Sequence, residues 1–270
     1  MQKSLIAGAV LLASVAAQAQ ISVGSTAFTY SQNFDALSNS TVASAWANNS
    51  TLSGWNLFIS TLAAPATIVG GTGSNNAGSF YSFGASAGTD RALGGVASGG
   101  AYFGAPAGGA VAGHIAVALT NNTGVGLAGF TLGFDGEQWR DGGAVIPAAQ
   151  SMVLQYGFGA TFAAVGSWTV PGGGFSWASP VFTNTATSAA VDGNTAGLVA
   201  GRGGAITTPW AAGDTLWLRW VENNDLGNDH GLAIDNFSFG VTPVPEPGAY
   251  ALLLAGLAVI GFVARRRVQA

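Results

Sequence analysis

The stretch at residues 215–223, TLWLRWVEN, decides the fold that the sequence predicts. Side chains alternate between the two faces of a β-strand, so Leu216, Leu218 and Trp220 share one face of this segment. The opposite face carries Arg219 between two apolar neighbours. A repeat of two residues, in place of the 3.6 of a helix, predicts that this segment is a β-strand.

The same alternation recurs along the chain. It is seen in HIAVALT at 114–120, GFTLGFDG at 129–136, SMVLQYGFG at 151–159 and GLAIDNFSFG at 231–240. Clusters of Gly, Asn and Asp separate these segments, as is typical of turns between short strands. We therefore predict an all-β fold, one antiparallel β-sandwich with a jelly-roll-like topology, over residues 20–241.

The composition agrees with short strands and excludes several classes of function. Charged residues make up 7% of the chain, Gly accounts for 42 of its 270 residues, and Cys is absent. No disulfide or thiolate chemistry is therefore available. Between the two termini, eleven acidic residues and four arginines give a net charge of −7. A domain without a basic stripe is a poor match for a phosphate backbone, so we expect no nucleic-acid partner.

The N-terminus, MQKSLIAGAVLLASVAAQAQ, has the parts of a secretory signal in their usual order. Lys3 precedes an apolar run, and Ala17 and Ala19 fit a small-x-small cleavage site. We predict a signal helix at residues 1–19 and a mature chain that begins at Gln20. The protein is then exported.

The C-terminus has similar parts in reverse order. Residues 249–264 are sixteen uncharged residues, which predicts a single transmembrane helix inserted transiently in the inner membrane. The cluster that follows consists of Arg265, Arg266 and Arg267. Such a cluster stays in the cytoplasm, so the middle of the chain lies outside. The stiff turn before the helix consists of Pro245, Glu246 and Pro247.

The segment at 244–267, VPEPGAYALLLAGLAVIGFVARRR, resembles the bacterial PEP-CTERM sorting signal, so residues 242–270 are assigned to sorting. The resemblance implies that an exosortase, a membrane transpeptidase, cuts near the Pro-Glu-Pro box. It also implies an inner-membrane-tethered precursor that ends at the cell surface or in the extracellular matrix. A permanent tail anchor is the alternative.

The central region also resembles a group of secreted bacterial jelly-roll or concanavalin-like domains. The segments that carry this resemblance include QNFDAL, NNTGVGLAGFTLGFDGEQWRDGG and LWLRWVENNDLGNDHGLAIDNFSFG. Membership of this group implies the sandwich fold and no particular activity. No catalytic residue follows from it.

An acid-rich region suggests a structural Ca²⁺, because hard cations take several carboxylate and carbonyl oxygens at once. The region at 222–235 supplies Glu222, Asp225, Asp229 and Asp235. Several sandwich carbohydrate-binding modules resemble it through an acidic step, here Ile234-Asp235-Asn236. That resemblance implies Asp35 as a further partner. The alternative is that these acids cap turns and keep the loop soluble.

The function predicted from these features is a non-catalytic structural or polysaccharide-binding role, with exopolysaccharide as the candidate ligand. The competing hypothesis is a secreted, glycosidase-like hydrolase. It would use Glu137, in the segment FDGEQWRDGG, together with a second carboxylate. Alternation directs Glu137 and Trp139 to the same side of their strand.

Overall fold

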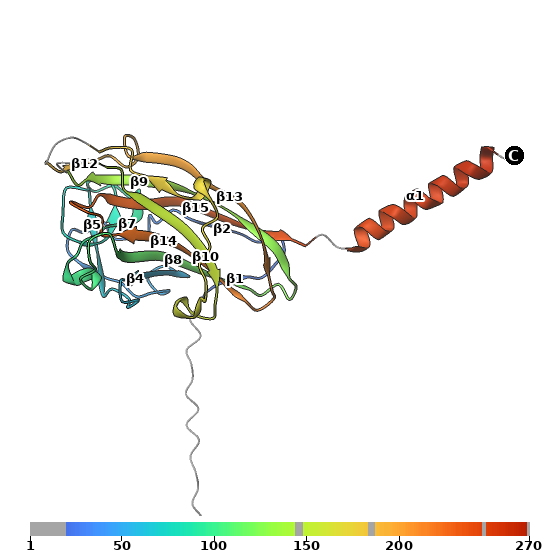
Figure 1. Cartoon of the computed structure of the whole chain (residues 1–270), viewed down its shortest axis with the longest axis horizontal. Coiled ribbons are helices and arrows are strands. Elements are labelled where there is room, and N and C mark those ends of the chain that lie inside the picture. Colours follow the sequence, from blue (N-terminus) through green and yellow to red (C-terminus); the bar gives the residue numbers. More distant parts are fainter. Residues whose placement is uncertain (1–19, 144–147, 183–186, 245–246, 269–270) are drawn as a thin grey trace, which may run out of the picture.

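The computed structural model describes residues 20–143, 148–182, 187–244 and 247–268. The predicted signal peptide at 1–19 therefore lies outside the described residues, as do Pro245 and Glu246 of the box. The described part of the central region is mostly β-structure arranged in two sheets (Figure 1). The all-β prediction is confirmed, and the arrangement is compatible with a jelly-roll-like sandwich.

One sheet has six strands in the described part of the chain, in the order β1-β8-β14-β10-β11, with β4 also paired to β8. Their bounds are β1 Ile21–Val23, β4 Trp55–Ile59, β8 Val111–Asn121, β10 Ser151–Phe158, β11 Trp177–Ala178 and β14 Thr215–Asn223. The quoted stretch TLWLRWVEN is β14, in the middle of this sheet. Most pairs are antiparallel as predicted, but β1 joins the end of β8 in parallel.

The other sheet has nine strands among the described residues, in the order β12-β9-β15-β7-β6-β5-β3, with β13 paired to β9 and β2 to β15. Their bounds are β2 Thr29–Gln32, β3 Ser44–Ala45, β5 Thr67–Gly71, β6 Ser79–Phe83, β7 Ala92–Val96, β9 Leu127–Asp141, β12 Ala189–Ala190, β13 Leu198–Trp210 and β15 Gly231–Pro243. Here β5 and β6 form a second parallel pair. The purely antiparallel prediction is therefore wrong at two places.

The core lies between the two sheets and is rich in aromatic rings. On β14, Leu216, Leu218 and Trp220 share one face, as the alternation predicted, and all three are completely buried in this core. Trp220 stacks on Trp55 at 5.9 Å between ring centroids, and Phe237 meets Trp55 edge-on at 5.2 Å. Burial of such large rings supplies most of the favourable free energy of a domain of this kind.

Each sheet also has a smaller cluster on its outer face. On the nine-stranded sheet, the outer cluster contains Tyr81, Phe83 and Trp139. On the six-stranded sheet, Trp217 packs with Phe162, which belongs to the short 3₁₀ helix η2 at Phe162–Ala164. Two more such helices are η1 at Ala101–Phe103 and η3 at Gly173–Phe175. Both outer faces are thus partly covered by connecting segments.

The C-terminal helix α1 spans Pro247–Val268 and follows the end of β15 (Figure 1). No helix in the described part of the chain is both long and apolar enough to cross a membrane, so the transmembrane helix predicted at 249–264 is not confirmed. Its uncharged run, residues 247–264, has eighteen residues, which at 1.5 Å per residue is about 27 Å, short of a hydrocarbon core of about 30 Å. The structure therefore has a helix at this place, but the prediction that this helix spans the membrane is not confirmed.

Candidate functional site

The outer face of the nine-stranded sheet holds Glu137, the residue of the hydrolase hypothesis. Its side chain is 2% exposed, and its Oε2 accepts a hydrogen bond of 2.8 Å from Nε1 of Trp139. Glu137 and Trp139 therefore share a face of β9, as predicted. Gly193 closes over them, since a Cβ there would lie 2.3 Å from the same indole nitrogen. Glu137 is held as a buried partner of a tryptophan.

Burial raises the pKa of Glu137 to about 7, although the hydrogen bond from Trp139 acts to lower this pKa. On the next strand, Asp235 is 2% exposed, and its Oδ1 has no hydrogen-bond partner in the described part of the chain. Burial raises the pKa of Asp235 to about 8, and the charge of Glu137 adds to this. Under the hydrolase hypothesis, Asp235 would be the second carboxyl group, and both acids are buried.

Arg140, on the same strand, has no carboxylate hydrogen-bond partner among the described residues. Its guanidinium donates to the carbonyl oxygens of Gly73 and Ser74 and to the hydroxyl of Ser188. The cation is held by neutral acceptors, so it tethers the 73–74 loop and the 188 segment to β9. The indole N–H of Trp139 donates to Glu137, which is its only hydrogen-bond partner among the described residues.

The structure separates the five predicted Ca²⁺ ligands into two places. Asp35 accepts hydrogen bonds from the backbone of Arg91 and from Asn33, and its charge acts on Asp235. The other three surround the end of β14 and are Glu222, Asp225 and Asp229. Among the described residues, no three acid or histidine groups have the spacing of a metal site. Calcium binding stays a prediction.

Glu222 is the most unusual of these acids. It is 3% exposed, and neither of its carboxylate oxygens has a hydrogen-bond partner in the described ranges. Burial raises its pKa well above the ordinary value, and the charges of Asp229 and Asp225 add to this. Burial also raises the pKa of Asp229 to about 7, although its Oδ1 accepts a 2.7 Å hydrogen bond from the backbone of Asp225.

A buried Ser-His-Asp arrangement was not predicted. Nδ1 of His230 lies 2.9 Å from the Ser179 hydroxyl, and its Nε2 lies 3.4 Å from Oδ1 of Asp141. Ser179 also accepts a hydrogen bond from the backbone of Gln150. All three members are 5% exposed or less, so a substrate has no direct approach to the serine. We interpret the arrangement as a link between β9, β15 and the connecting segments.

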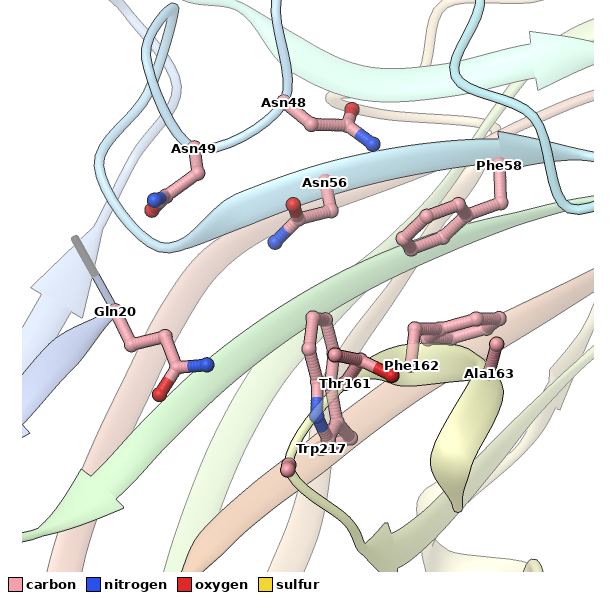
Figure 2. A pocket seen from close by; sticks show the side chains of 10 residues that line it. Gln20, Asn48, Asn49, Asn56, Phe58, Thr161, Phe162, Ala163 and Trp217 are labelled. Carbon is pink, nitrogen blue, oxygen red and sulfur yellow. The ribbon is translucent and has the colours of Figure 1, made fainter. Parts of the chain in front are cut away.

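A different kind of site lies on the outer face of the six-stranded sheet, where a cavity of about 230 Å³ opens (Figure 2). Segments far apart in the sequence build it: the residue before β1, the turn before β4, β4 itself, β14, and the loop that contains η2. Its lining consists of Gln20, Asn48, Asn49, Asn56, Phe58, Ala160, Thr161, Phe162, Ala163 and Trp217. None of these side chains is ionisable.

Aromatic rings form one side of this pocket. Phe58 stacks on Phe162 at 4.1 Å between centroids, and Trp217 meets Phe162 edge-on at 5.5 Å. Nε1 of Trp217 already donates to the carbonyl oxygen of Gly159 at 3.0 Å. The indole therefore contributes carbon surface to the pocket, while its one hydrogen-bond donor is used inside the protein.

Three asparagines line the other side of the pocket, and they differ in which of their hydrogen-bonding groups have no partner. Asn48 is fully engaged, because its amide accepts from and donates to the backbone of Leu57. Asn49 accepts a 2.7 Å hydrogen bond from the backbone N–H of Gly54, and its Nδ2 has no partner in the described chain. Asn56 donates to the carbonyl oxygen of Gly54, which leaves its Oδ1 without a partner there. Figure 2 shows all three beside the rings.

Two more polar groups complete the lining. Gln20 accepts hydrogen bonds from the hydroxyls of Thr120 and Thr215, so its Nε2 stays unused among the described contacts. The Thr161 hydroxyl accepts from the backbone N–H of Ala164, which leaves its own proton available. The pocket therefore offers two amide donors, one amide acceptor and one hydroxyl donor beside apolar rings.

Comparison with known proteins adds information only at the C-terminus. The model of the PEP-CTERM protein-sorting motif matches residues 243–267, which include most of α1. No curated protein matches the chain. The fold and this motif define an exported protein with a β-rich domain in front of a sorting signal. The chain carries a PEP-CTERM motif, and processing by an exosortase-type enzyme follows from it.

Proposed function

We propose that the protein is a surface or extracellular-matrix component whose β-sandwich binds polysaccharide and does not cleave it. The observation that carries this proposal is the pocket of Figure 2, where unused amide and hydroxyl groups adjoin aromatic carbon surface. Ligand pockets commonly combine apolar walls with a few polar groups that fix orientation. The sorting motif supports an exported destination.

Binding and turnover are separated by one experiment on the exported protein. Polysaccharide is incubated with the wild type, and both the bound fraction and the newly formed reducing ends are measured. We expect binding without new reducing ends. Release of reducing ends that stops in Glu137→Gln would establish the hydrolase instead. That alternative rests on the buried pair Glu137 and Asp235, whose pKa values are raised to about 7 and about 8.

The processing steps are tested by mass spectrometry of the protein from exosortase-competent cells. We expect a mature N-terminus at Gln20 and a C-terminus near the Pro-Glu-Pro box. A chain that still ends at Ala270 in those cells would contradict sorting, and one that still begins at Met1 would contradict the signal peptide.

A structural Ca²⁺ is a further part of the proposal. The unpartnered carboxylate of Glu222 supports it, because a cation beside Glu222 and Asp229 would compensate a buried acid and a half-buried one at once. A cation at this place would stabilise the loop without taking part in ligand binding at the pocket.

A further inference from the structure

The pocket of Figure 2 carries a more specific inference than polysaccharide binding in general. We propose that it holds the terminal residue of an uncharged glycan chain. This inference rests on the proposed function and adds two features to it: the class of saccharide, and recognition at a chain end. Three properties of the lining carry it, namely its charge, its unused hydrogen-bonding groups and its size.

The side chains of the lining carry no charge that would attract an acidic sugar. Each of them is neutral at all ordinary pH values. A uronate, sulfate or phosphate group placed there would lose its hydration without gaining a cationic side chain as a partner, which is costly. Arg219 lies near by, 3.8 Å from the ring centroid of Trp168 and 5.8 Å from that of Phe162, and it is bonded to Gln155, but it is not part of the lining. The predicted cleavage also creates an α-ammonium group at Gln20, so an acidic probe tests this exclusion directly.

The unused groups match the hydroxyls of a sugar. Nδ2 of Asn49 and Nε2 of Gln20 are donors, whereas Oδ1 of Asn56 is an acceptor, and each lacks a partner in the described part of the chain. A sugar hydroxyl both donates and accepts, so it pairs with either kind of group. The amide ends that face the protein are already bonded, so these side chains are held in place before a ligand arrives.

The rings and the size set the number of sugar residues. The walls from Phe58, Phe162 and Trp217 present carbon surface, which suits the C–H groups on the face of a sugar ring. The cavity of about 230 Å³ is smaller than the roughly 300–1,000 Å³ of most ligand pockets. One ring fits such a volume, and the remainder of the chain has to lie outside. The pocket is therefore suited to a chain end.

The test uses the full exported protein and a panel of defined trisaccharides: maltotriose, cellotriose, mannotriose and triacetylchitotriose as neutral probes, and trigalacturonate as the acidic one. Binding is measured by calorimetry and by tryptophan fluorescence, since Trp217 is in the wall. Asn49→Asp replaces the free donor by an oxygen yet keeps the acceptor for Gly54, and aspartate tolerates the backbone φ of 63° at this position. Gln20→Glu makes the same change at the other donor.

The matched control is Asn75→Asp. Asn75 is exposed, lies outside the pocket, and also uses its Oδ1 to accept a backbone hydrogen bond, from Ala77. We expect at least one neutral trisaccharide to bind the wild type and the control equally, and each pocket variant to lose about tenfold or more in affinity.

The outcomes separate this inference from the proposed function. Glycan binding that survives both pocket variants would overturn the pocket assignment and leave polysaccharide binding intact. Binding of trigalacturonate alone would overturn the neutral class. Binding of polysaccharide but of no trisaccharide would overturn recognition of the chain end. Failure to bind any glycan at all would overturn the inference and the proposed function together.

Discussion

The two outer faces of the sandwich use similar residues to opposite effect. On the nine-stranded sheet, Trp139 and Glu137 bond to each other beneath Gly193. On the six-stranded sheet, Trp217 bonds to a backbone carbonyl and leaves its ring beside amides with unused groups. The first face buries its acids and is closed, although Oδ1 of Asp235 has no partner there in the described part of the chain. The second face has unused polar groups beside a cavity. An aromatic residue next to a polar one is therefore a candidate site only where the unused hydrogen-bonding groups are open to a ligand.

The largest effect that tests this comparison is on stability. Trp139→Ala should lower the free energy of unfolding by about 3–5 kcal/mol, because it removes a large buried ring. It also removes the only hydrogen-bond partner that the buried Glu137 has among the described residues. Chemical denaturation measures the loss. Trp168→Ala, at a half-buried tryptophan of the other face, is the control and should cost clearly less. Equal losses would contradict the closed character of the Trp139 face.

The next effect is a pH dependence. The pKa values of Glu137, Asp229 and Asp235 are raised to about 7, 7 and 8 in the folded protein. Between about pH 4 and pH 8, the folded state keeps protons that the unfolded state has released. Stability should therefore fall as the pH rises through this range, by about 1–3 kcal/mol for each such group. Denaturation at pH 5 and pH 8.5 measures the change.

Glu137→Gln provides the comparison for that experiment. Glutamine keeps an oxygen for the indole of Trp139 but does not titrate, so the fall in stability between the two pH values should be smaller. An unchanged slope would show that Glu137 is not among the groups responsible. A wild type more stable at pH 8.5 than at pH 5 would contradict the raised pKa values as the dominant cause.

A smaller effect is expected from calcium. An extracellular site with a Kd of about 0.1–1 mM, measured in 10 mM Ca²⁺, would stabilise the fold by about 1.4–2.7 kcal/mol and raise the Tm by a few degrees. Thermal unfolding in excess Ca²⁺ and in excess EDTA measures the shift. Glu222→Gln should abolish it, whereas Asp35→Asn, in the other group of acids, should not. Identical melting temperatures in the two conditions would eliminate the calcium prediction.

The smallest effect on stability belongs to the open face. Asn49→Asp should change the free energy of unfolding by less than about 1 kcal/mol, because the bond from Gly54 is kept and the lost donor had no partner in the described chain. The same variant should lose glycan binding. A large loss of stability would mean that the amide serves the fold, and the contrast between the two faces would disappear.

The features of the molecule that the sequence predicted correctly are those that depend on residues close to one another along the chain. Alternation correctly put Trp220 on one face with Leu216 and Leu218, and Glu137 and Trp139 on one face of β9. It did not show which face of β14 lies in the core. The sorting motif is a contiguous segment and was recognised as such. The predicted membrane span is not confirmed. The prediction rested on a run of uncharged residues, and the absence of charge does not by itself show that a helix is long and apolar enough to cross a membrane.

The pocket was missed for the opposite reason. Its free donors and acceptor come from Gln20, Asn49 and Asn56, and its walls come from residues as distant as Trp217. The parallel pairing of β1 with β8 brings the first of these segments to the sheet, and no local pattern signals that pairing. The Ser179–His230–Asp141 arrangement was missed likewise, because its members are 38 to 89 positions apart in sequence. For the pocket, the only hint in the local sequence was the pair of adjacent asparagines at 48–49.

The contrast between the faces is tested most directly by one titration. Neutral trisaccharides are added to the wild type, Glu137→Gln and Asn49→Asp while tryptophan fluorescence is recorded. We predict the same saturable change for the wild type and Glu137→Gln, and a curve shifted to about tenfold higher concentration or more for Asn49→Asp. Loss of the response in Glu137→Gln with a normal response in Asn49→Asp would contradict the account, since it would place the ligand on the face that we describe as closed.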